Sequence, residues 1–316
     1  MKKRTIIALI VAGVLIIAGG MLTILGLSFA GDSTQKSELI RQEITIQENF
    51  ENIAIDTADC DVKFAMFSGR DDCMVEVYSY ENVKHTAAVE NGTLKIQMVD
   101  ERNWTDHIDI GRTESMEMTV YLPAAEYESL QIRTTTGDIA LAQEPVFLET
   151  LLRTNTGDIS CVGVSSDALD CMTSTGDISL QNCAPNMLKL QSNTGDFKVS
   201  TVAGDEIHMM TNTGELDAEV VNALTVTCKT ETGDVELEKV LAEDYLQIRT
   251  DTGDVGVENC DAGRVDIETD TGDVSGHFLT SKWFSAFSDT GNVTVPNAPE
   301  GGECRIQTDT GDIHFE

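Results

Sequence analysis

Acidic side chains recur at a fixed spacing through the C-terminal two-thirds of the chain, where a row of carboxylates could bind hard cations. An aspartate follows the glycine in eight of ten copies of a T-x-T-G-D motif, and Glu215 and Asn292 replace it in the other two. Calcium takes carboxylate oxygens as ligands. In the later copies a second aspartate stands two residues before the glycine. The predicted calcium ligands are therefore Asp251, Asp254, Asp270, Asp273, Asp289, Asp309 and Asp312.

The same aspartates also fit a structural role, in which each carboxylate accepts hydrogen bonds from turn amides and faces water. The G-G-x-G-x-D pattern of calcium-binding β-rolls is absent from the sequence. Calcium binding and turn chemistry are thus two alternatives for this row. We expect no other cofactor.

No group of residues has the spacing of a known catalytic motif. The five histidines are scattered, and neither H-E-x-x-H nor G-x-S-x-G nor a Walker pattern occurs. An active site should interrupt a repeat, and no copy stands out in this way. The sequence therefore predicts a non-enzymatic protein, and a β-helix carbohydrate-active enzyme is the alternative that we favour least.

Basic residues gather on one side of the repeats although the chain is strongly acidic. The formal net charge is −33, from 54 acidic and 21 basic residues, which argues against nucleic acid as a partner. The basic side chains stand four or six residues before the motif glycines. They could bind an anionic wall polymer, or they could keep an exposed sheet soluble and unpaired. They are Arg133, Arg153, Lys189, Lys229, Arg249 and Arg305.

The repeat itself predicts the elements that position these residues. Motif glycines follow one another every 19 or 20 residues, a period typical of solenoids. Apolar and polar residues alternate on both sides of the glycine, so each flank is a strand with one face inward. The inward set changes parity across the glycine, so the chain must turn there. The glycines of this turn are Gly137, Gly157, Gly176, Gly195, Gly214, Gly233, Gly253, Gly272, Gly291 and Gly311.

Each copy forms one rung, and stacked rungs should pair in parallel at about 4.8 Å per rung. The predicted fold class is all-β, a parallel β-solenoid or β-helix of about ten 19-residue rungs over residues 129–316. Right-handed winding follows from the usual handedness of parallel crossovers. The threonine columns should form hydroxyl ladders on or near the inner face.

The N-terminus predicts the location of the protein. Three basic residues, Lys2 to Arg4, precede an uncharged apolar stretch at residues 6–29, which is long enough to cross a bilayer as one helix. Positive residues stay in the cytoplasm, so residues 31–316 should be extracytoplasmic on a bacterial cell membrane. The alternative is a signal sequence over residues 1–30, cleaved after Ala30, which would make the protein secreted.

Between anchor and repeats, residues 31–43 are polar and predict a linker. Residues 44–128 alternate like strands but lack the T-G-D step, and they predict an irregular β region that caps the solenoid. Asn91-Gly92 is typical of a hairpin turn. Residues 101–115 predict a surface loop in this region.

The other end of the solenoid has no predicted cap. Its final strand reaches Glu316, so its backbone groups would lack a pairing strand. This predicts a protein partner or end-to-end self-association.

Several segments resemble one known bacterial family when they are taken in order. They are residues 50–57 (Phe-Glu-Asn-Ile-Ala-Ile-Asp-Thr), 91–96 (Asn-Gly-Thr-Leu-Lys-Ile), 118–123 (Met-Thr-Val-Tyr-Leu-Pro) and the T-G-D repeats. The chain resembles a family of predicted adhesins, a domain of unknown function that includes LiaG-like envelope proteins. The resemblance covers residues 40–316, and it implies a β-solenoid in a cell-envelope setting without catalytic residues.

These observations favour an adhesin-like binding scaffold on the outer face of a bacterial membrane. Its ligand would be a cell-wall polymer, a host surface or a protein. A sensory or regulatory accessory in envelope-stress signalling is the alternative that the LiaG-like relatives suggest.

Overall fold

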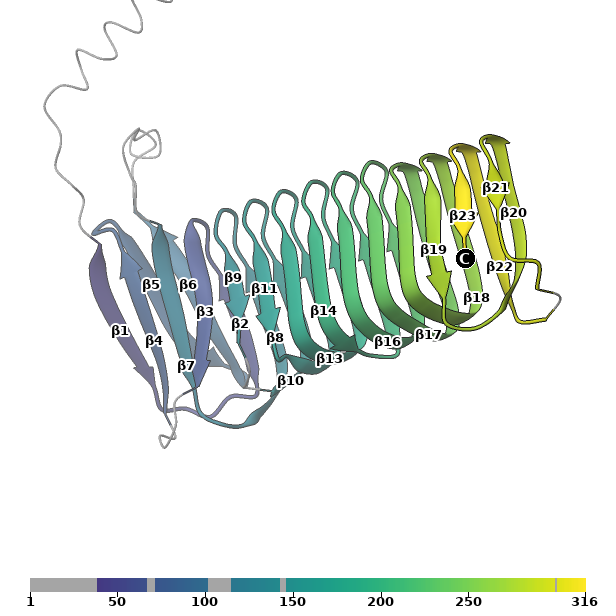
Figure 1. Ribbon diagram of the computed structural model, residues 1–316. Coiled ribbons are helices and arrows are strands. Elements are labelled where there is room, and N and C mark those ends of the chain that lie inside the picture. The colour runs from purple at the N-terminus through teal and green to yellow at the C-terminus, as the bar shows by residue number, and fades with distance from the viewer. Residues whose placement is uncertain (1–38, 67–71, 102–114, 143–145, 299) are drawn as a thin grey trace, which may run out of the picture. The chain divides into compact units, whose positions relative to one another are not determined.

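The computed structural model describes residues 39–66, 72–101, 115–142, 146–298 and 300–316, and its regular elements there are all strands (Figure 1). The predicted anchor at residues 6–29 and most of the predicted loop at 101–115 lie outside these residues. Within them, the structure contains no helix with the length and apolar character that crossing a bilayer requires.

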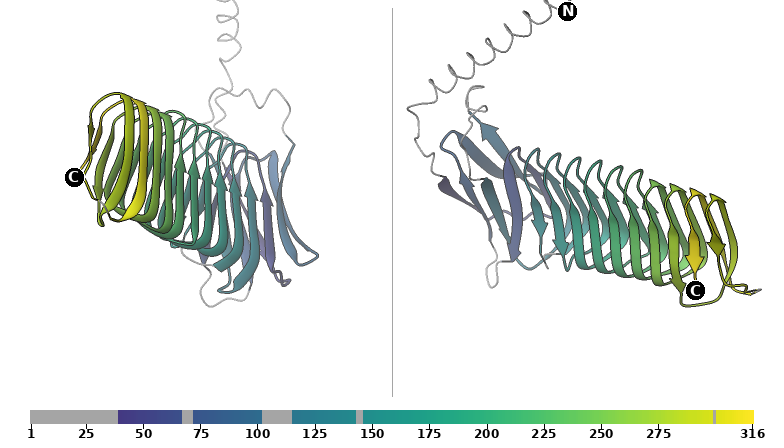
Figure 2. Two further views of the ribbon diagram at one scale, coloured as in Figure 1. Left: turned by 90° about the vertical axis from the view of Figure 1, so that its right-hand side faces the viewer. Right: turned by 45° about the horizontal axis from the view of Figure 1, so that its top comes forward.

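From residue 126 onward the chain winds into a parallel β-solenoid of about 9 turns, where about ten were predicted (Figures 1 and 2). The all-β, parallel solenoid architecture is confirmed, and its right-handed winding stays a prediction. The strands are β8 (Glu126–Arg133), β9 (Ile139–Leu141), β10 (Val146–Arg153), β11 (Ile159–Val162), β12 (Ser165–Met172), β13 (Ile178–Gln191), β14 (Phe197–Ala203), β15 (Glu206–Met210), β16 (Leu216–Lys229), β17 (Val235–Thr252), β18 (Val255–Thr271), β19 (Val274–Phe278), β20 (Lys282–Thr290), β21 (Val293–Thr294), β22 (Gly302–Thr310) and β23 (Ile313–Phe315). Equivalent residues lie side by side, as Leu152 does between Ile132 and Cys171. Neighbouring rungs therefore present the same columns of side chains.

The core is a continuous aliphatic column along the solenoid. Side chains five or seven residues before the glycine and two residues after it point inward, and Ile132, Val235 and Ile248 are fully buried. Burying one such side chain stabilises a protein by about 1.5–3 kcal/mol. A single rung leaves these side chains half covered, so this stabilisation depends on the rungs above and below.

At the corner, every motif glycine except Gly137 lies directly against the glycine of a neighbouring rung. A Cβ atom on Gly195 would lie only 1.9 Å from the carbonyl oxygen of Gly176, and the φ of Gly195 is +156°. Side chains rarely adopt that backbone conformation. Glycine is therefore required here for the rungs to stack at normal β spacing.

The threonine three residues before the glycine points into the core, as predicted. Thr230 Oγ1 donates to the carbonyl oxygen of Gly214 at 3.3 Å, and Thr269 Oγ1 donates to that of Gly253 at 3.2 Å. Each hydroxyl thus bonds to the glycine of the preceding rung, and not to the next hydroxyl as a ladder would require. It satisfies a carbonyl group at the crowded corner.

A second corner, which the repeat pattern did not reveal, lies six residues after the motif glycine. Asn182, Thr201, Val220, Lys239 and Asn259 all have φ between 54° and 57° there. Asparagine tolerates this left-handed conformation, whereas a β-branched residue is strained in it.

Replacing Val220 by asparagine should therefore raise the free energy of unfolding by about 1 kcal/mol. The reverse change at the equivalent position, Asn182→Val, should lower it by a similar amount. Denaturant unfolding of both variants checks this pair. If Asn182→Val proved as stable as the parent, strain at the second corner would be negligible.

Antiparallel strands cover the N-terminal end of the solenoid. β5 (Val83–Glu90) and β6 (Thr93–Asp100) form the hairpin predicted at Asn91-Gly92. β4 (Cys73–Ser79) pairs antiparallel with both β1 (Ile40–Ile46) and β7 (Met116–Leu122). β1 begins inside the segment that the sequence suggested as a linker.

An irregular first rung joins this cap to the repeats. It consists of β2 (Asn52–Asp56) and β3 (Cys60–Met66), and β2 pairs in parallel with β8. Cys60 takes the place of the motif glycine in this rung. A Cβ atom on Gly137 would lie 2.3 Å from the carbonyl oxygen of Cys60, as it would from the preceding glycine in later rungs. Asp61 takes the place of the aspartate and accepts from the Asp138 amide at 3.0 Å. The repeat therefore begins with Thr57-x-x-Cys60-Asp61, which lacks the T-G-D letters.

The last rungs do not stack in chain order. β22 lies between β18 and β20, and β23 lies between β19 and β21 (Figure 1). The C-terminal rung is thus inserted before the rung of residues 282–294, which we call the end rung. The sequence predicted a free edge at the strand that reaches Glu316, and this was wrong. The free edge is formed by β20 and β21 of the end rung.

Candidate binding surfaces

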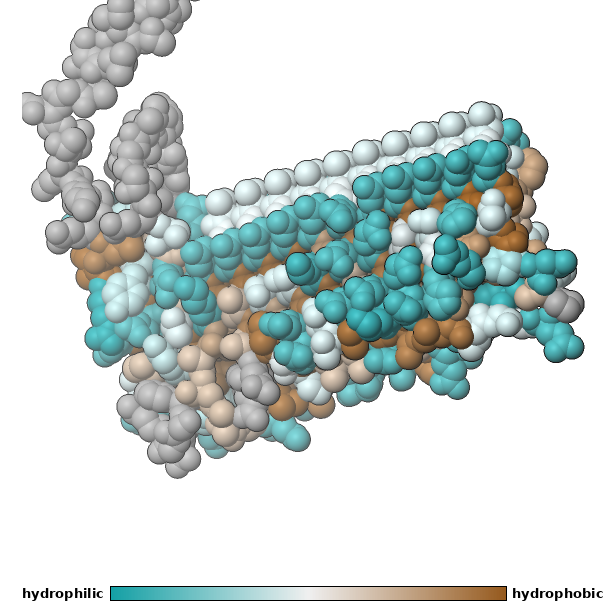
Figure 3. All heavy atoms as spheres, in the orientation of Figure 1, coloured by the Kyte–Doolittle hydropathy of each residue, from teal (hydrophilic) through white to brown (hydrophobic). Residues whose placement is uncertain are grey.

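The recurrent aspartates line one long edge of the solenoid, where Figure 3 shows a continuous hydrophilic row. Each carboxylate accepts a hydrogen bond from the amide of the equivalent residue in the next rung. Asp138 Oδ1 accepts from the Asp158 amide at 2.8 Å, and Asp254 Oδ1 accepts from the Asp273 amide at 2.8 Å. These bonds give the aspartates a structural role at the corner that needs no metal.

The seven predicted calcium ligands lie in two exposed columns on this edge. Within the residues that the structure describes, no three His, Cys, Asp or Glu side chains are arranged to hold a metal ion. Calcium binding at this edge stays a prediction. The first column comprises Asp254, Asp273 and Asp312, and the second comprises Asp251, Asp270, Asp289 and Asp309.

Glu236 stands apart from the other carboxylates. Its pKa is raised, first by burial and then by the charges of neighbouring carboxylates, of which Asp234 contributes most. Its carboxylate lies over Gly256, where a Cβ atom would come within 2.1 Å of Oε2. Because Glu236 is exposed overall, its ionised form destabilises the fold at neutral pH only slightly.

The variant Glu236→Gln should unfold at a higher temperature than the parent at pH 7, by roughly 1–2 °C. Because the folded-state pKa is raised, the parent regains this stability when acidification protonates the carboxyl, so the gain should vanish as pH falls through that pKa. Calorimetry at several pH values tests this, with Glu219→Gln as the control for a glutamate on the preceding rung. A gain that does not change with pH would assign it to packing.

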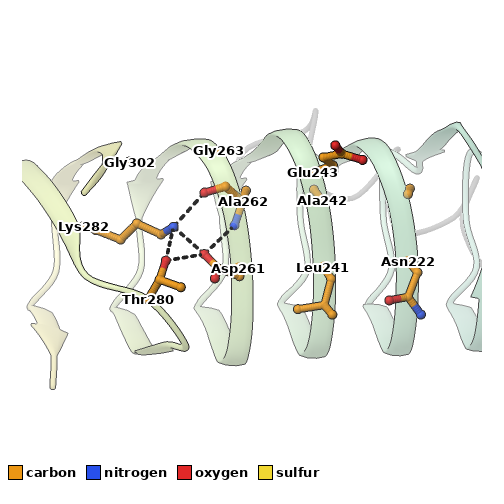
Figure 4. Close-up of a pocket in the computed structure, with 11 residues that line it drawn as sticks. Asn222, Leu241, Ala242, Glu243, Asp261, Ala262, Gly263, Thr280, Lys282 and Gly302 are labelled. Carbon is orange, nitrogen blue, oxygen red and sulfur yellow. Dashed lines mark hydrogen bonds and ion pairs between the residues drawn. The ribbon is translucent and has the colours of Figure 1, made fainter.

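Lys282 is a buried cation where the chain crosses to the end rung (Figure 4). Its side chain is 2 % exposed, and Nζ donates to Asp261 Oδ1, to the Ala262 carbonyl at 2.7 Å and to Thr280 Oγ1 at 3.0 Å. An ammonium group has three donors, so all are used. This arrangement holds the crossing segment in place, and it offers no free amine for covalent catalysis.

The six basic residues singled out in the sequence all lie on the outward side of the strand before the glycine. One column of this face, four residues before each glycine, runs from Arg133 to Arg249 without an acidic residue. Exposed apolar side chains accompany it, with Met187 50 % and Met210 38 % exposed. We call this the basic–apolar face, and it comprises Arg133, Leu151, Arg153, Met172, Met187, Lys189, Met210 and Lys229.

Ion pairs divide the six basic residues into two groups. Arg249 pairs with Glu268 at 3.0 Å, and Arg305 lies 3.9 Å from Asp266. Among the described residues, the four basic side chains of the basic–apolar face have no acidic partner within 4.0 Å. The available positive charge therefore lies within the first six of the ten repeat copies.

Arg153 has a hydrogen-bond donor that a bound ligand could satisfy. Its Nε atom is buried and has no hydrogen-bond partner among the described residues. A buried donor without a partner costs about 1–3 kcal/mol. An anionic group bound beside Arg153 could accept that hydrogen bond. Asp170 Oδ1, one rung away on the same face, is likewise buried without a partner.

Three features of these surfaces were missed in the sequence. The buried role of Lys282 depends on the reordered last rungs, which no local pattern encodes. The second corner could have been found from Gly163, Asn182 and Asn259, which share one position and favour positive φ. The first rung could have been found from the spacing of Thr57 and Asp61.

Known proteins resemble this chain in sequence or in structure. No curated protein matches the chain. A predicted adhesin from Bacteroides fragilis aligns at 12 % identity over 88 % of this chain and 97 % of its own, with a TM-score of 0.45. A predicted lipid-binding protein from Parabacteroides distasonis aligns at 15 % identity over 87 % and 96 %, with a TM-score of 0.41. The family model Toastrack DUF4097 matches residues 50–237 and 205–316, which together span most of the sequence. The chain therefore belongs to the Toastrack DUF4097 family.

Proposed function

We propose that this protein is a non-enzymatic binding scaffold of the bacterial cell envelope, which binds an anionic polymer along its basic–apolar face. The observation that carries the proposal is a set of four arginine and lysine side chains that have no acidic partner among the described residues, on a chain whose net charge is −33. Surface cations on an acidic protein are normally neutralised by their neighbours, as Arg249 is. The four basic side chains of the basic–apolar face are the exception, because they are not neutralised in this way.

The chemistry of the face suits a repeating phosphate or carboxylate polymer. Arg133 and Arg153 are paired residues on adjacent rungs, whose strands lie about 4.8 Å apart, and each guanidinium group can bind one anionic group with two donors. The methionines between the cations offer flexible apolar contacts to the polymer backbone. Extended polymers can thus follow the solenoid axis.

The location forms part of the same proposal. The apolar stretch at residues 6–29 follows three basic residues, which supports a single-pass anchor with the N-terminus in the cytoplasm and residues 31–316 outside. Cleavage after Ala30 would release the scaffold instead. Either outcome brings the basic–apolar face into contact with wall polymers.

A sedimentation assay tests the proposal. The full chain in mild detergent is mixed with isolated bacterial cell walls and with mucin, each with and without a calcium chelator. We expect saturable binding to cell walls, and loss of at least about 90 % of it when Arg133, Arg153, Lys189 and Lys229 are all changed to glutamine. Equal binding by parent and variant would overturn the proposed surface. Loss of binding with chelator would show that the aspartate columns take part.

A further inference from the structure

Beyond the proposed function, we propose that the end rung is an interface for a second copy of this chain. In this arrangement the two β20 strands pair antiparallel about a two-fold axis at Ser285. The outer edge of one solenoid thereby completes that of the other. Exposure, backbone direction and side-chain complementarity support this pairing independently.

Large apolar side chains are most exposed at the end rung and in the segment that leads into it. Among the described residues, Phe287, Trp283 and Leu279 are the most exposed large hydrophobic side chains, at 57 %, 55 % and 54 %. Phe284 and Ala286 point toward the core but stay only partly buried, because no further rung of the described residues covers them. Edge strands normally carry outward charges or proline that prevent pairing. The outward positions of β20 through residue 288 are Trp283, Ser285 and Phe287.

The backbone of β20 is open on one side. Among the described residues β20 pairs only with β22. In regular rungs the carbonyl four residues before the glycine points back to the preceding rung, as Arg249 O accepts from the Thr230 amide at 2.9 Å. The same pattern in β20 directs the backbone groups of Phe284, Ala286 and Ser288 away from β22. They are free to pair.

These free groups select one antiparallel register. Centred on Ser285, residue 284 of one copy hydrogen-bonds with residue 286 of the other, while residues 283 and 287 form pairs without hydrogen bonds. On the inner side, Phe284 meets Ala286, a large residue against a small one. On the outer side, Trp283 meets Phe287, and such cross-strand aromatic pairs stabilise a sheet. The strand is thus complementary to itself.

Charge favours a second copy over a strand from an unrelated partner. In this register Asp289 lies opposite Ser281 and Lys282 lies opposite Ser288, so no like charges face each other. The two-fold axis also places the acidic edge of each copy against residues 279–281 of the other. Two strongly acidic solenoids can therefore meet at end rungs whose charged residues are only Lys282 and Asp289.

A cysteine at the axis tests the register directly. In a pair without hydrogen bonds, the two Cα atoms lie about 4.5 Å apart, which is within the range that a disulfide bridges. The full-length Ser285→Cys variant in detergent should form a covalent dimer on mild oxidation. Background reaction should be low, because all eight native cysteines are buried and burial raises the pKa of Cys228 to about 12. Thr227→Cys is the control, at the equivalent position of an internal rung.

Substitution of an aromatic anchor gives the second readout. Trp283→Glu should weaken dimerisation of the full chain at least about 100-fold by sedimentation velocity, since each dimer contains the change twice. Met187→Glu, at the equivalent position of an internal rung, should leave dimerisation unchanged. A cross-linking yield for Ser285→Cys no higher than for Thr227→Cys would overturn the proposal. A dimer that survives Trp283→Glu would overturn it too, since it would use another surface.

Discussion

The variant Gly195→Ala is expected to lose about 4 kcal/mol or more of its free energy of unfolding. A Cβ atom there would lie 1.9 Å from the carbonyl oxygen of Gly176, a backbone atom that cannot move without separating the two rungs. Losses of this size arise only from a few mechanisms, and a forced backbone clash at a special φ is one. Denaturant unfolding followed by circular dichroism measures the loss.

Gly92→Ala is the matched control for this experiment. Gly92 also has a positive φ, +75°, but a Cβ atom there would meet nothing within 4 Å. The variant Gly92→Ala should lose only about 1 kcal/mol of its free energy of unfolding, the usual penalty for a side chain in the left-handed region. If Gly195→Ala cost no more than Gly92→Ala, close packing of the glycine column would not be what the motif requires.

The second large effect is expected for Asp261→Ala. This change leaves the ammonium group of Lys282, whose side chain is 2 % exposed, without its carboxylate partner. Removing one member of a buried ion pair costs about 3–5 kcal/mol. Because rungs contact only their neighbours, the loss should concentrate at the end rung. Hydrogen exchange should accelerate in β20 and β21 and stay unchanged in β12 to β16.

Lys282→Met separates the charge effect from packing. Methionine has nearly the same length as lysine. Asp261 then loses its cationic partner, but its side chain is 23 % exposed and can be hydrated. We expect Lys282→Met to destabilise the protein less than Asp261→Ala does. The opposite order would mean that the three hydrogen bonds from Nζ outweigh the cost of the isolated cation.

The regular part of the fold could be predicted because one rung repeats the same physical constraints. Alternating apolar residues identify the strands, and the change of parity at Gly195 and its equivalents requires a corner. The stacking of Ile132 on Leu152 follows from that period alone. Predictions of this kind depend only on the spacing of residues along the chain, which can be read directly from the sequence.

Features that depend on tertiary order could not be predicted in the same way. Residues 302–315 have the same local pattern as any rung, so nothing local shows that they insert before the end rung. The first rung escaped notice because Cys60 stands where other rungs have glycine. At the second corner, Val220 and Lys239 obscure a position where asparagine would have been informative.

The candidate binding surface was predictable only in part. Periodicity places Arg133, Arg153 and Lys229 on the outward face, and the structure places them there. Their state of pairing depends on neighbours one rung away, at positions set by the exact register. Glu268 neutralises Arg249, whereas Met210 and Arg249 flank Lys229. The distinction between available and paired cations therefore required the fold.

The most direct test of the binding scaffold compares two double variants of the full chain on a soluble poly(glycerol phosphate) polymer. Fluorescence anisotropy would give the dissociation constant at several salt concentrations. Arg153→Gln with Lys229→Gln, which removes unpaired cations, should weaken binding about 10-fold or more and reduce its salt dependence. Arg249→Gln with Arg305→Gln, which removes paired cations of the same face, should change it little. Equal losses in both variants, or no binding by the parent, would contradict the account.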